Sequence, residues 1–206
     1  MVRWLPAGSP PGLATFTLLA WGAAEVALRL RLAMKPGWRE RLHAWSVGPG
    51  GKLREWTFFM LVLTIGGAVV GAIWLSRLTR FAIGGAIAIT IAGEVVAVAG
   101  IALRVWAILT LDRFFTFVVG IVPDQRVVQH GPYRMLRHPG YAGALLALLG
   151  AGIVLANWFS LLVLVLVPAL VLSVRITVEE AALAGALGAE YLAYASRTSR
   201  LIPGVW

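Results

Sequence analysis

The residues best suited to chemistry gather between positions 124 and 143, which read DQRVVQHGPYRMLRHPGYAG. Two histidines, two tyrosines, three arginines and two prolines fall within these 20 positions. A segment that faces lipid would not carry so many polar side chains, because hydrocarbon offers them no hydrogen-bond partners. We therefore expect this segment to line a polar pocket or to lie in water.

One helix start within this segment has the features of an anion site. Pro139 begins an apolar run, and proline is favoured at the first position of a helix. The first N–H groups of a helix have no partner inside it, and they carry the positive end of the helix dipole. Because Arg137 and His138 directly precede Pro139, the sequence predicts that an anion binds at this helix start.

A second polar cluster, Arg175, Glu179 and Glu180, follows an apolar run further along the chain. Arg175 and Glu179 are four positions apart, so they share one face of a helix. The apolar runs 141–156 and 159–174 are split by Asn157 and Trp158, which predicts a tight helical hairpin. Such a hairpin returns the second cluster to the membrane side of the first, so both segments are expected to form one site.

The composition indicates a membrane protein. Of 206 residues, 60% are hydrophobic and 13% are charged, and the mean hydropathy is +0.85. A soluble domain is about half apolar and about a quarter charged, so this composition excludes a soluble globule and a disordered chain. The absence of cysteine excludes disulfides, thiolate metal sites and a cysteine nucleophile. The net charge of +9 points to anionic lipid rather than nucleic acid, since no basic run is interleaved with aromatics.

The apolar runs predict the number of membrane spans. A spanning helix needs about 20 mainly apolar residues. Five runs approach this length: 13–32, 56–75, 81–111, 141–156 and 159–174. After Thr177 the apolar residues recur with helical spacing on one face, which predicts a surface helix. The expected fold is an all-α integral membrane protein with about five transmembrane helices, a C-terminal helical hairpin and a cytoplasmic amphipathic helix.

The basic residues predict the orientation of these spans. The segments after spans one, three and five hold seven, four and three Lys and Arg residues, whereas those on the opposite side hold one, two and none. Positively charged loops stay in the cytoplasm, so the N-terminus is expected outside the cell membrane and the two polar clusters on the cytoplasmic side. We expect residues 1–111 to hold the first three spans, and residues 112–206 to hold the cofactor-binding and catalytic region.

The C-terminal sequence resembles the isoprenylcysteine carboxyl methyltransferase family. The resemblance lies in GPYRMLRHPGYAG, in RITVEE from position 175, in LGAEYLAY and in a late Pro203, and it covers about residues 121–206. Members of this family are integral membrane enzymes that use S-adenosylmethionine. The first 110 residues share only hydrophobic spans with the family, and the chain is similar to short prokaryotic members that lack the additional N-terminal spans of the eukaryotic enzymes.

The resemblance implies a role for each polar residue. The GPY and RHPxYxG segments would wrap the cofactor together with the terminal helix, and the predicted cofactor contacts are His130, Tyr133, Arg137, His138, Tyr141 and Glu180. His130 is equally compatible with a pocket wall and with a solvated loop. Arg175 and Glu179 match the arginine and the acid that handle the substrate carboxylate, so they are the predicted catalytic residues. Asn157 also matches a polar position, but the expected topology places it on the far side of the membrane.

Two acids within the predicted spans, Glu25 and Glu94, each have two possible roles. Each is either a site residue or a protonated acid that is bonded to a neighbouring helix. Arg104, ten positions after Glu94, does not share its face. No metal is expected, because no second ligand stands at metal spacing from His138. The expected partners are the lipid bilayer and a lipophilic small molecule or lipidated peptide, and the oligomeric state is not predicted.

The expected reaction is methyl transfer from S-adenosylmethionine to a carboxylate. A carboxylate is already ionised at neutral pH, so the reaction needs alignment and exclusion of water rather than a general base. A phospholipid amine or a thiol is an alternative acceptor. An NADPH-dependent lipid or sterol reductase is a second hypothesis, although a dinucleotide needs more basic surface. A scaffold or transporter is a third, and a transport path would need polar residues near mid-membrane.

Overall fold

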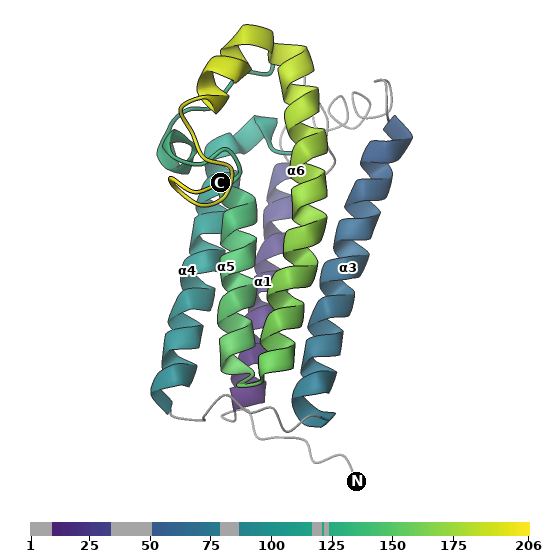
Figure 1. Ribbon diagram of the computed structural model, residues 1–206, viewed down its shortest axis with the longest axis vertical. Helices are drawn as coiled ribbons and strands as arrows, with labels where there is room; N and C mark the ends of the chain where they lie inside the picture. Colours follow the sequence, from purple (N-terminus) through teal and green to yellow (C-terminus); the bar gives the residue numbers. More distant parts are fainter. Residues whose placement is uncertain (1–9, 34–50, 79–86, 117–120, 122–123) are drawn as a thin grey trace.

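Long helices that lie side by side make up the structure, a computed structural model that describes residues 10–33, 51–78, 87–116, 121 and 124–206. The long helices are α1 (Pro10–Ala33), α3 (Gly51–Leu78), α4 (Ile87–Leu111), α5 (Pro139–Val154) and α6 (Trp158–Ala195). Helices α1, α4 and α6 run in one direction along the bundle, and α3 and α5 run in the other (Figure 1). No strand occurs in the described ranges, so the all-α prediction is confirmed.

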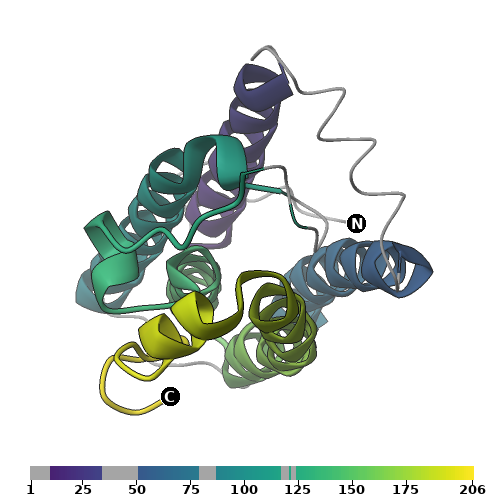
Figure 2. The same cartoon turned by 90° about the horizontal axis from the view of Figure 1, so that it is seen from above.

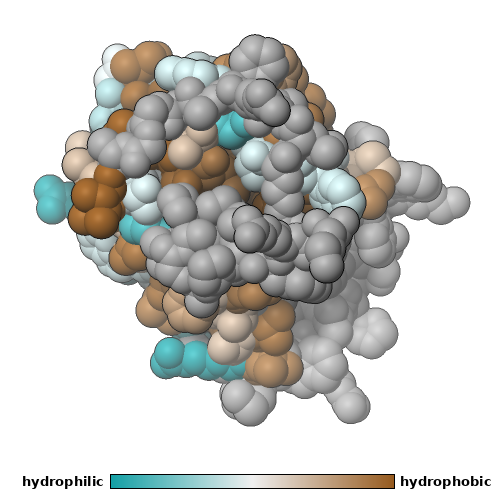
Figure 3. Space-filling model, turned by 90° about the horizontal axis from the view of Figure 1, so that it is seen from below, coloured by the Kyte–Doolittle hydropathy of each residue, from teal (hydrophilic) through white to brown (hydrophobic). Residues whose placement is uncertain are grey.

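The outer faces of the bundle are apolar. Phe16 of α1 is 71% exposed and Leu170 of α6 is 68% exposed. Seen from the end of the bundle at which α5 joins α6, hydrophobic side chains dominate the described surface (Figure 3). Contiguous apolar surface of this kind is unfavourable in water. The bundle therefore suits hydrocarbon, as the composition predicts.

Two of the described helices are long and apolar enough to cross a membrane, and they lie at Ile87–Phe114 and Trp158–Ala195. The apolar parts of the other three are shorter, at Phe16–Leu28, Met60–Ser76 and Pro139–Val154. The membrane character of the chain is confirmed, whereas the count of five spans stays a prediction. Residues 34–50 and 79–86, which hold part of the basic charge behind the predicted orientation, lie outside the described residues.

The end of α6 differs from the prediction. The helix passes Thr177 without a break and departs from helical geometry only at Gly188, where φ is 54° and ψ is −129°. The sequence between these positions is rich in alanine, leucine and glutamate, which are strong helix formers. The expected start of a new helix after Thr177 is therefore wrong, because α6 continues to the kink at Gly188. The amphipathic helix itself and its position at the membrane surface stay predictions.

The predicted hairpin joins α5 to α6 through a turn that the sequence stabilises. Asn157 caps α6, since its side-chain oxygen accepts a hydrogen bond from the backbone N–H of Ser160 at 3.0 Å. The Ser160 hydroxyl donates to the carbonyl of Ala72 in α3 at 2.8 Å, which ties the turn to a third helix. Asn157 thus has a structural role at the end of the bundle away from the polar clusters.

Glycines allow α4 and α5 to approach each other closely. A Cβ atom added at Gly150 would lie 2.3 Å from the backbone nitrogen of Ala97, and one added at Gly100 would lie 2.3 Å from that of Ala147. Small residues at such contacts are typical of helix pairs in membranes. The same approach brings Arg104 of α4 next to the first turn of α5, where Gly143 faces its backbone.

We predict that Gly150→Ala destabilises the protein by about 1–3 kcal/mol, the usual cost of overpacking, because the new methyl group would force α4 and α5 apart. Thermal unfolding in detergent micelles measures the effect. Gly67→Ala in α3 is the matched control, since nothing lies within 4 Å of its Cβ position and alanine favours a helix. Equal unfolding temperatures for the two variants would contradict the predicted contact.

Candidate functional site

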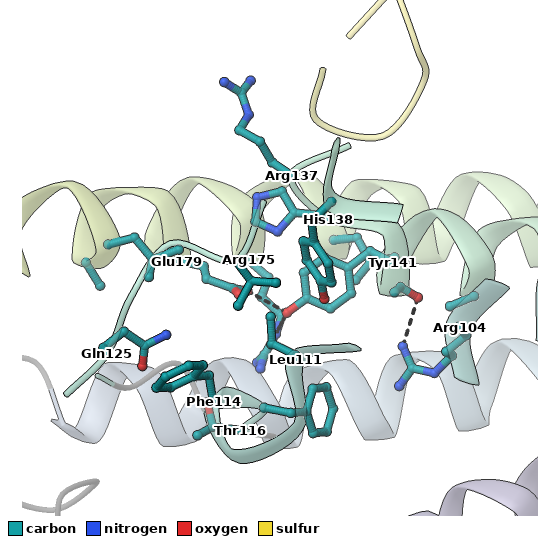
Figure 4. A pocket seen from close by; sticks show the side chains of 18 of the residues that line it. Arg104, Leu111, Phe114, Thr116, Gln125, Arg137, His138, Tyr141, Arg175 and Glu179 are labelled. Carbon is teal, nitrogen blue, oxygen red and sulfur yellow. Dashed lines mark hydrogen bonds between the residues drawn. The ribbon is translucent and has the colours of Figure 1, made fainter. Parts of the chain in front are cut away.

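A cavity of about 320 Å³ opens at the end of the bundle where α4 ends and α5 begins. Ligand pockets commonly measure about 300–1,000 Å³, so the cavity suits a small molecule. Charged and aromatic residues at the ends of α4, α5 and α6 line one part of it, among them Arg104, Tyr141 and Arg175 (Figure 4). The rest of the wall includes apolar residues of α3, and Trp21 and Glu25 of α1. The cavity therefore offers a polar side and an apolar side to whatever it binds.

Tyr141 connects the two polar clusters inside this cavity. Its hydroxyl accepts a hydrogen bond from Nε of Arg175 at 2.7 Å and donates one to Oε2 of Glu179 at 2.7 Å (Figure 4). The His138 ring stacks on the Tyr141 ring, with a centroid distance of 5.5 Å and an angle of 13° between the planes. Arg175 is only 3% exposed. The two distant segments, 124–143 and 175–180, therefore contact each other as predicted.

Glu180 lies behind the cavity wall and binds three cationic or protonatable side chains. Its Oε1 atom lies 3.0 Å from Nε of Arg137 and 3.3 Å from Nε2 of His138. Its Oε2 atom lies 2.9 Å from Nη2 of Arg200. Arg137 also donates to the carbonyl of Ala195 at 2.6 Å. Glu180 thus orients two of the predicted cofactor contacts while it stays outside the cavity lining.

The C-terminal segment lies beside the start of α5 (Figure 2). The backbone N–H of Arg137 donates to the carbonyl of Ser199 at 2.8 Å, and that of His138 donates to the carbonyl of Arg200 at 3.1 Å. These two amides are consequently unavailable to a ligand. Binding of an anion at this helix start would therefore depend mainly on charged side chains, whereas the sequence analysis emphasised backbone N–H groups.

Tyr133 and His130, which flank the first turn of this segment, have different environments. Tyr133 is buried in η2 (Gly131–Arg134) and lines the cavity. Burial raises the pKa of Tyr133 well above its ordinary value, so the phenol stays protonated at neutral pH. His130 precedes η2, is exposed and does not line the cavity. Of its two readings, the solvated loop fits the structure better.

The structure shows an ion pair that the sequence did not predict, and it fits the interpretation of Glu25 as a site residue. Arg104 of α4 pairs with Glu25 of α1, and both residues line the cavity. Arg104 also donates to the carbonyl of Gly140 in α5 at 3.0 Å, and Nε1 of Trp21 donates to Glu25 at 3.2 Å. The sequence shows only that Glu25 and Arg104 are charges within predicted spans. It does not show that they pair, because spacing along the chain does not tell which helices are neighbours.

Glu94, the other acid within a predicted span, lies away from the cavity lining. Thr17 of α1 donates to Oε2 of Glu94 at 2.6 Å. This contact agrees with the second of its two readings, an acid bonded to a neighbouring helix. Glu25 and Glu94 together attach α1 to α4 at two levels of the bundle.

Known proteins match the part of the chain that builds this site. Residues 91–185 match the isoprenylcysteine carboxyl methyltransferase (ICMT) family. A probable protein-S-isoprenylcysteine O-methyltransferase of Oryza sativa subsp. indica is 37% identical over 113 residues, which are 54% of this chain and 59% of the rice protein. Protein-S-isoprenylcysteine O-methyltransferase A of Arabidopsis thaliana is 33% identical over 115 residues, which are 55% of this chain and 58% of that protein.

A solved structure shares the fold. The eukaryotic intramembrane Ras methyltransferase ICMT superposes with a TM-score of 0.57 at 25% identity, over 69% of this chain and 52% of that chain. The chain covers less than two thirds of the length of each of these relatives. The matched helices α4, α5 and most of α6 carry the residues around Tyr141. Through this region the chain is similar to the isoprenylcysteine carboxyl methyltransferase family.

Proposed function

We propose that this protein is a membrane methyltransferase that moves a methyl group from S-adenosylmethionine to the carboxylate of a lipophilic acceptor, such as a prenylcysteine-type C-terminus. The observation that carries the proposal is a pair of hydrogen bonds that joins Arg175 to Tyr141 and Tyr141 to Glu179. These residues lie at the wall of a cavity that is polar on one side and apolar on the other. The names of the rice and Arabidopsis relatives support the same reaction.

The residues of the cavity fit S-adenosylmethionine, which combines a carboxylate, an ammonium, a sulfonium and a flat adenine. Arg137 provides positive charge for the carboxylate, and the aromatic rings of Tyr133, His138 and Tyr141 provide surfaces for apolar parts of the ligand. Glu179 provides negative charge for a cationic centre. When bound, S-adenosylmethionine supplies a methyl group on positively charged sulfur, which is activated for transfer.

Arg175 would bind the acceptor carboxylate and aim one of its oxygens. Tyr141 and Glu179 hold Arg175 in place. The Tyr141 hydroxyl lies between Arg175 and Glu179 and forms a hydrogen bond of 2.7 Å with each. The apolar wall includes Trp21, Leu61, Val62, Ile65 and Leu172, which would contact the hydrophobic part of the acceptor and exclude water. A dry cavity strengthens the attraction between the carboxylate and the guanidinium.

The proposal includes the placement of the protein in the membrane. Five helices would cross the cell membrane, with the N-terminus outside and the cavity facing the cytoplasm, and the end of α6 would lie at the membrane surface. Residues 1–111 would supply the apolar wall and the Glu25–Arg104 ion pair. Residues 112–206 would supply the donor contacts and Arg175. A lipid-modified acceptor could then reach the cavity from the bilayer.

Calorimetry on the detergent-purified full chain should show saturable binding of S-adenosylmethionine, and transfer to a prenylcysteine analogue should follow. We predict that Arg175→Ala lowers the transfer rate by roughly 100-fold or more, because the carboxylate loses its alignment, while donor affinity is nearly unchanged. Arg197→Ala is the matched control, since Arg197 is exposed and donates to the carbonyl of Ala193. Loss of donor binding in folded Arg175→Ala would instead assign Arg175 to the donor.

The same purified protein distinguishes the alternative functions. If it binds NADPH and not S-adenosylmethionine, the reductase hypothesis replaces the methyltransferase. If it binds S-adenosylmethionine but methylates only a phospholipid amine or a thiol, the donor assignment stands and the carboxylate acceptor is wrong. Substrate movement across liposomes without S-adenosylmethionine would support a transporter.

The pH dependence of transfer reports the acceptor class. A carboxylate ionises near pH 4, so the single-turnover rate should be flat from about pH 6 to pH 9 for this acceptor. An amine or a thiol loses its proton at higher pH, so its rate should rise through the same range. We expect the flat profile, measured by rapid quench where chemistry limits the rate. A rate that rises with pH would contradict the carboxylate.

A further inference from the structure

Tyr191, in the last turns of α6, carries a polar group that the described chain buries without satisfying. The residue is 5% exposed, and its hydroxyl has no hydrogen-bond partner among the described residues. Tyr194, one turn further on, lies in the same wall, but its hydroxyl is 2.9 Å from the carbonyl of Tyr133 and 3.1 Å from that of Leu136. Buried hydroxyls normally have a partner, so the environment of Tyr191 is unusual.

The location of Tyr191 suggests what the missing partner is. The residue lines the cavity, and it follows Gly188, where the positive φ of 54° turns the end of α6 over the start of α5. Glu180, Arg137 and Glu179 act on the Tyr191 hydroxyl through their charges, and Arg200 interacts with it as well.

This corner of the site carries a surplus of positive charge. Arg137 and Arg200 both pair with the single carboxylate of Glu180. Glu179, which also acts on Tyr191, is joined to Arg175 through the Tyr141 hydroxyl, so three arginines stand against two carboxylates. A neutral phenol among such charges acts as a hydrogen-bond donor to an anion, and bonds to charged acceptors are stronger than bonds between neutral groups. The partner of Tyr191 is therefore expected to be an anionic oxygen.

We propose that the Tyr191 hydroxyl donates a hydrogen bond to the carboxylate of the bound methyl donor. The proposal rests on the proposed function, because S-adenosylmethionine presents one carboxylate, and Arg137 provides the charge that would attract it to this corner. Tyr191 would then distinguish the complete donor from nucleosides that lack the carboxylate. It would be a binding residue that is separate from Arg175, which handles the acceptor.

Binding of two ligands to Tyr191→Phe tests this contact. The ligands are S-adenosylmethionine and its decarboxylated form, which differ only in the carboxylate, and calorimetry on the detergent-purified full chain measures both affinities. We expect Tyr191→Phe to weaken S-adenosylmethionine binding roughly tenfold and to change the binding of the decarboxylated ligand less than about twofold.

Tyr194→Phe is the matched control for folding. Because the Tyr194 hydroxyl bonds to the chain itself, this variant should lower the unfolding temperature, whereas Tyr191→Phe without ligand should unfold at or above the wild-type temperature. Equal affinity of Tyr191→Phe and wild type for S-adenosylmethionine would overturn the contact, as would an equal loss for both ligands. Failure of the wild type to bind S-adenosylmethionine at all would overturn the proposed function as well.

Discussion

The buried guanidinium of Arg175 is the interaction around which the site is organised. A charge removed from water is costly unless hydrogen bonds and opposite charge compensate it. Tyr141 and Glu179 supply that compensation, and they come from α5 and from the next turn of α6. Breaking either contact would leave a buried charge poorly compensated, so the hairpin must hold α5 and α6 in one register. The cap at Asn157 and the contact from Ser160 to α3 hold the other end of the same hairpin.

The close approach of α4 and α5 extends this constraint into the N-terminal half of the chain. Because glycines remove side chains from the contact, the backbone of α4 reaches the first turn of α5, and Arg104 bonds to the carbonyl of Gly140. Arg104 in turn pairs with Glu25, so α1 is coupled to the turn that carries His138 and Tyr141. The N-terminal helices therefore belong to the site, since α1, α3 and α4 all contribute to the cavity wall.

The sequence predicts the parts of this site that depend on local spacing. Proline at position 139, the i to i+4 spacing of Arg175 and Glu179, and the short break at Asn157 were enough to place two clusters at one end of a hairpin. Spacing could not reveal that Glu25 pairs with Arg104, because the two residues lie on different helices. Which helices are neighbours is determined by tertiary packing. Spacing also could not show that Glu180 lies outside the cavity lining, where it pairs with Arg137, His138 and Arg200.

Charge balance in the cavity bears on the choice of acceptor. Among the described lining residues, the arginines at positions 104, 126, 137 and 175 outnumber the acids Glu25 and Glu179. A methyl donor that carries two positive centres and one carboxylate adds net positive charge to this surplus. An acceptor that arrives as an ammonium ion would meet repulsion from both, and it would also have to lose a proton before reacting. A carboxylate acceptor instead reduces the surplus and needs no proton transfer, so the electrostatics of the wall and the chemistry of the reaction favour the same substrate class.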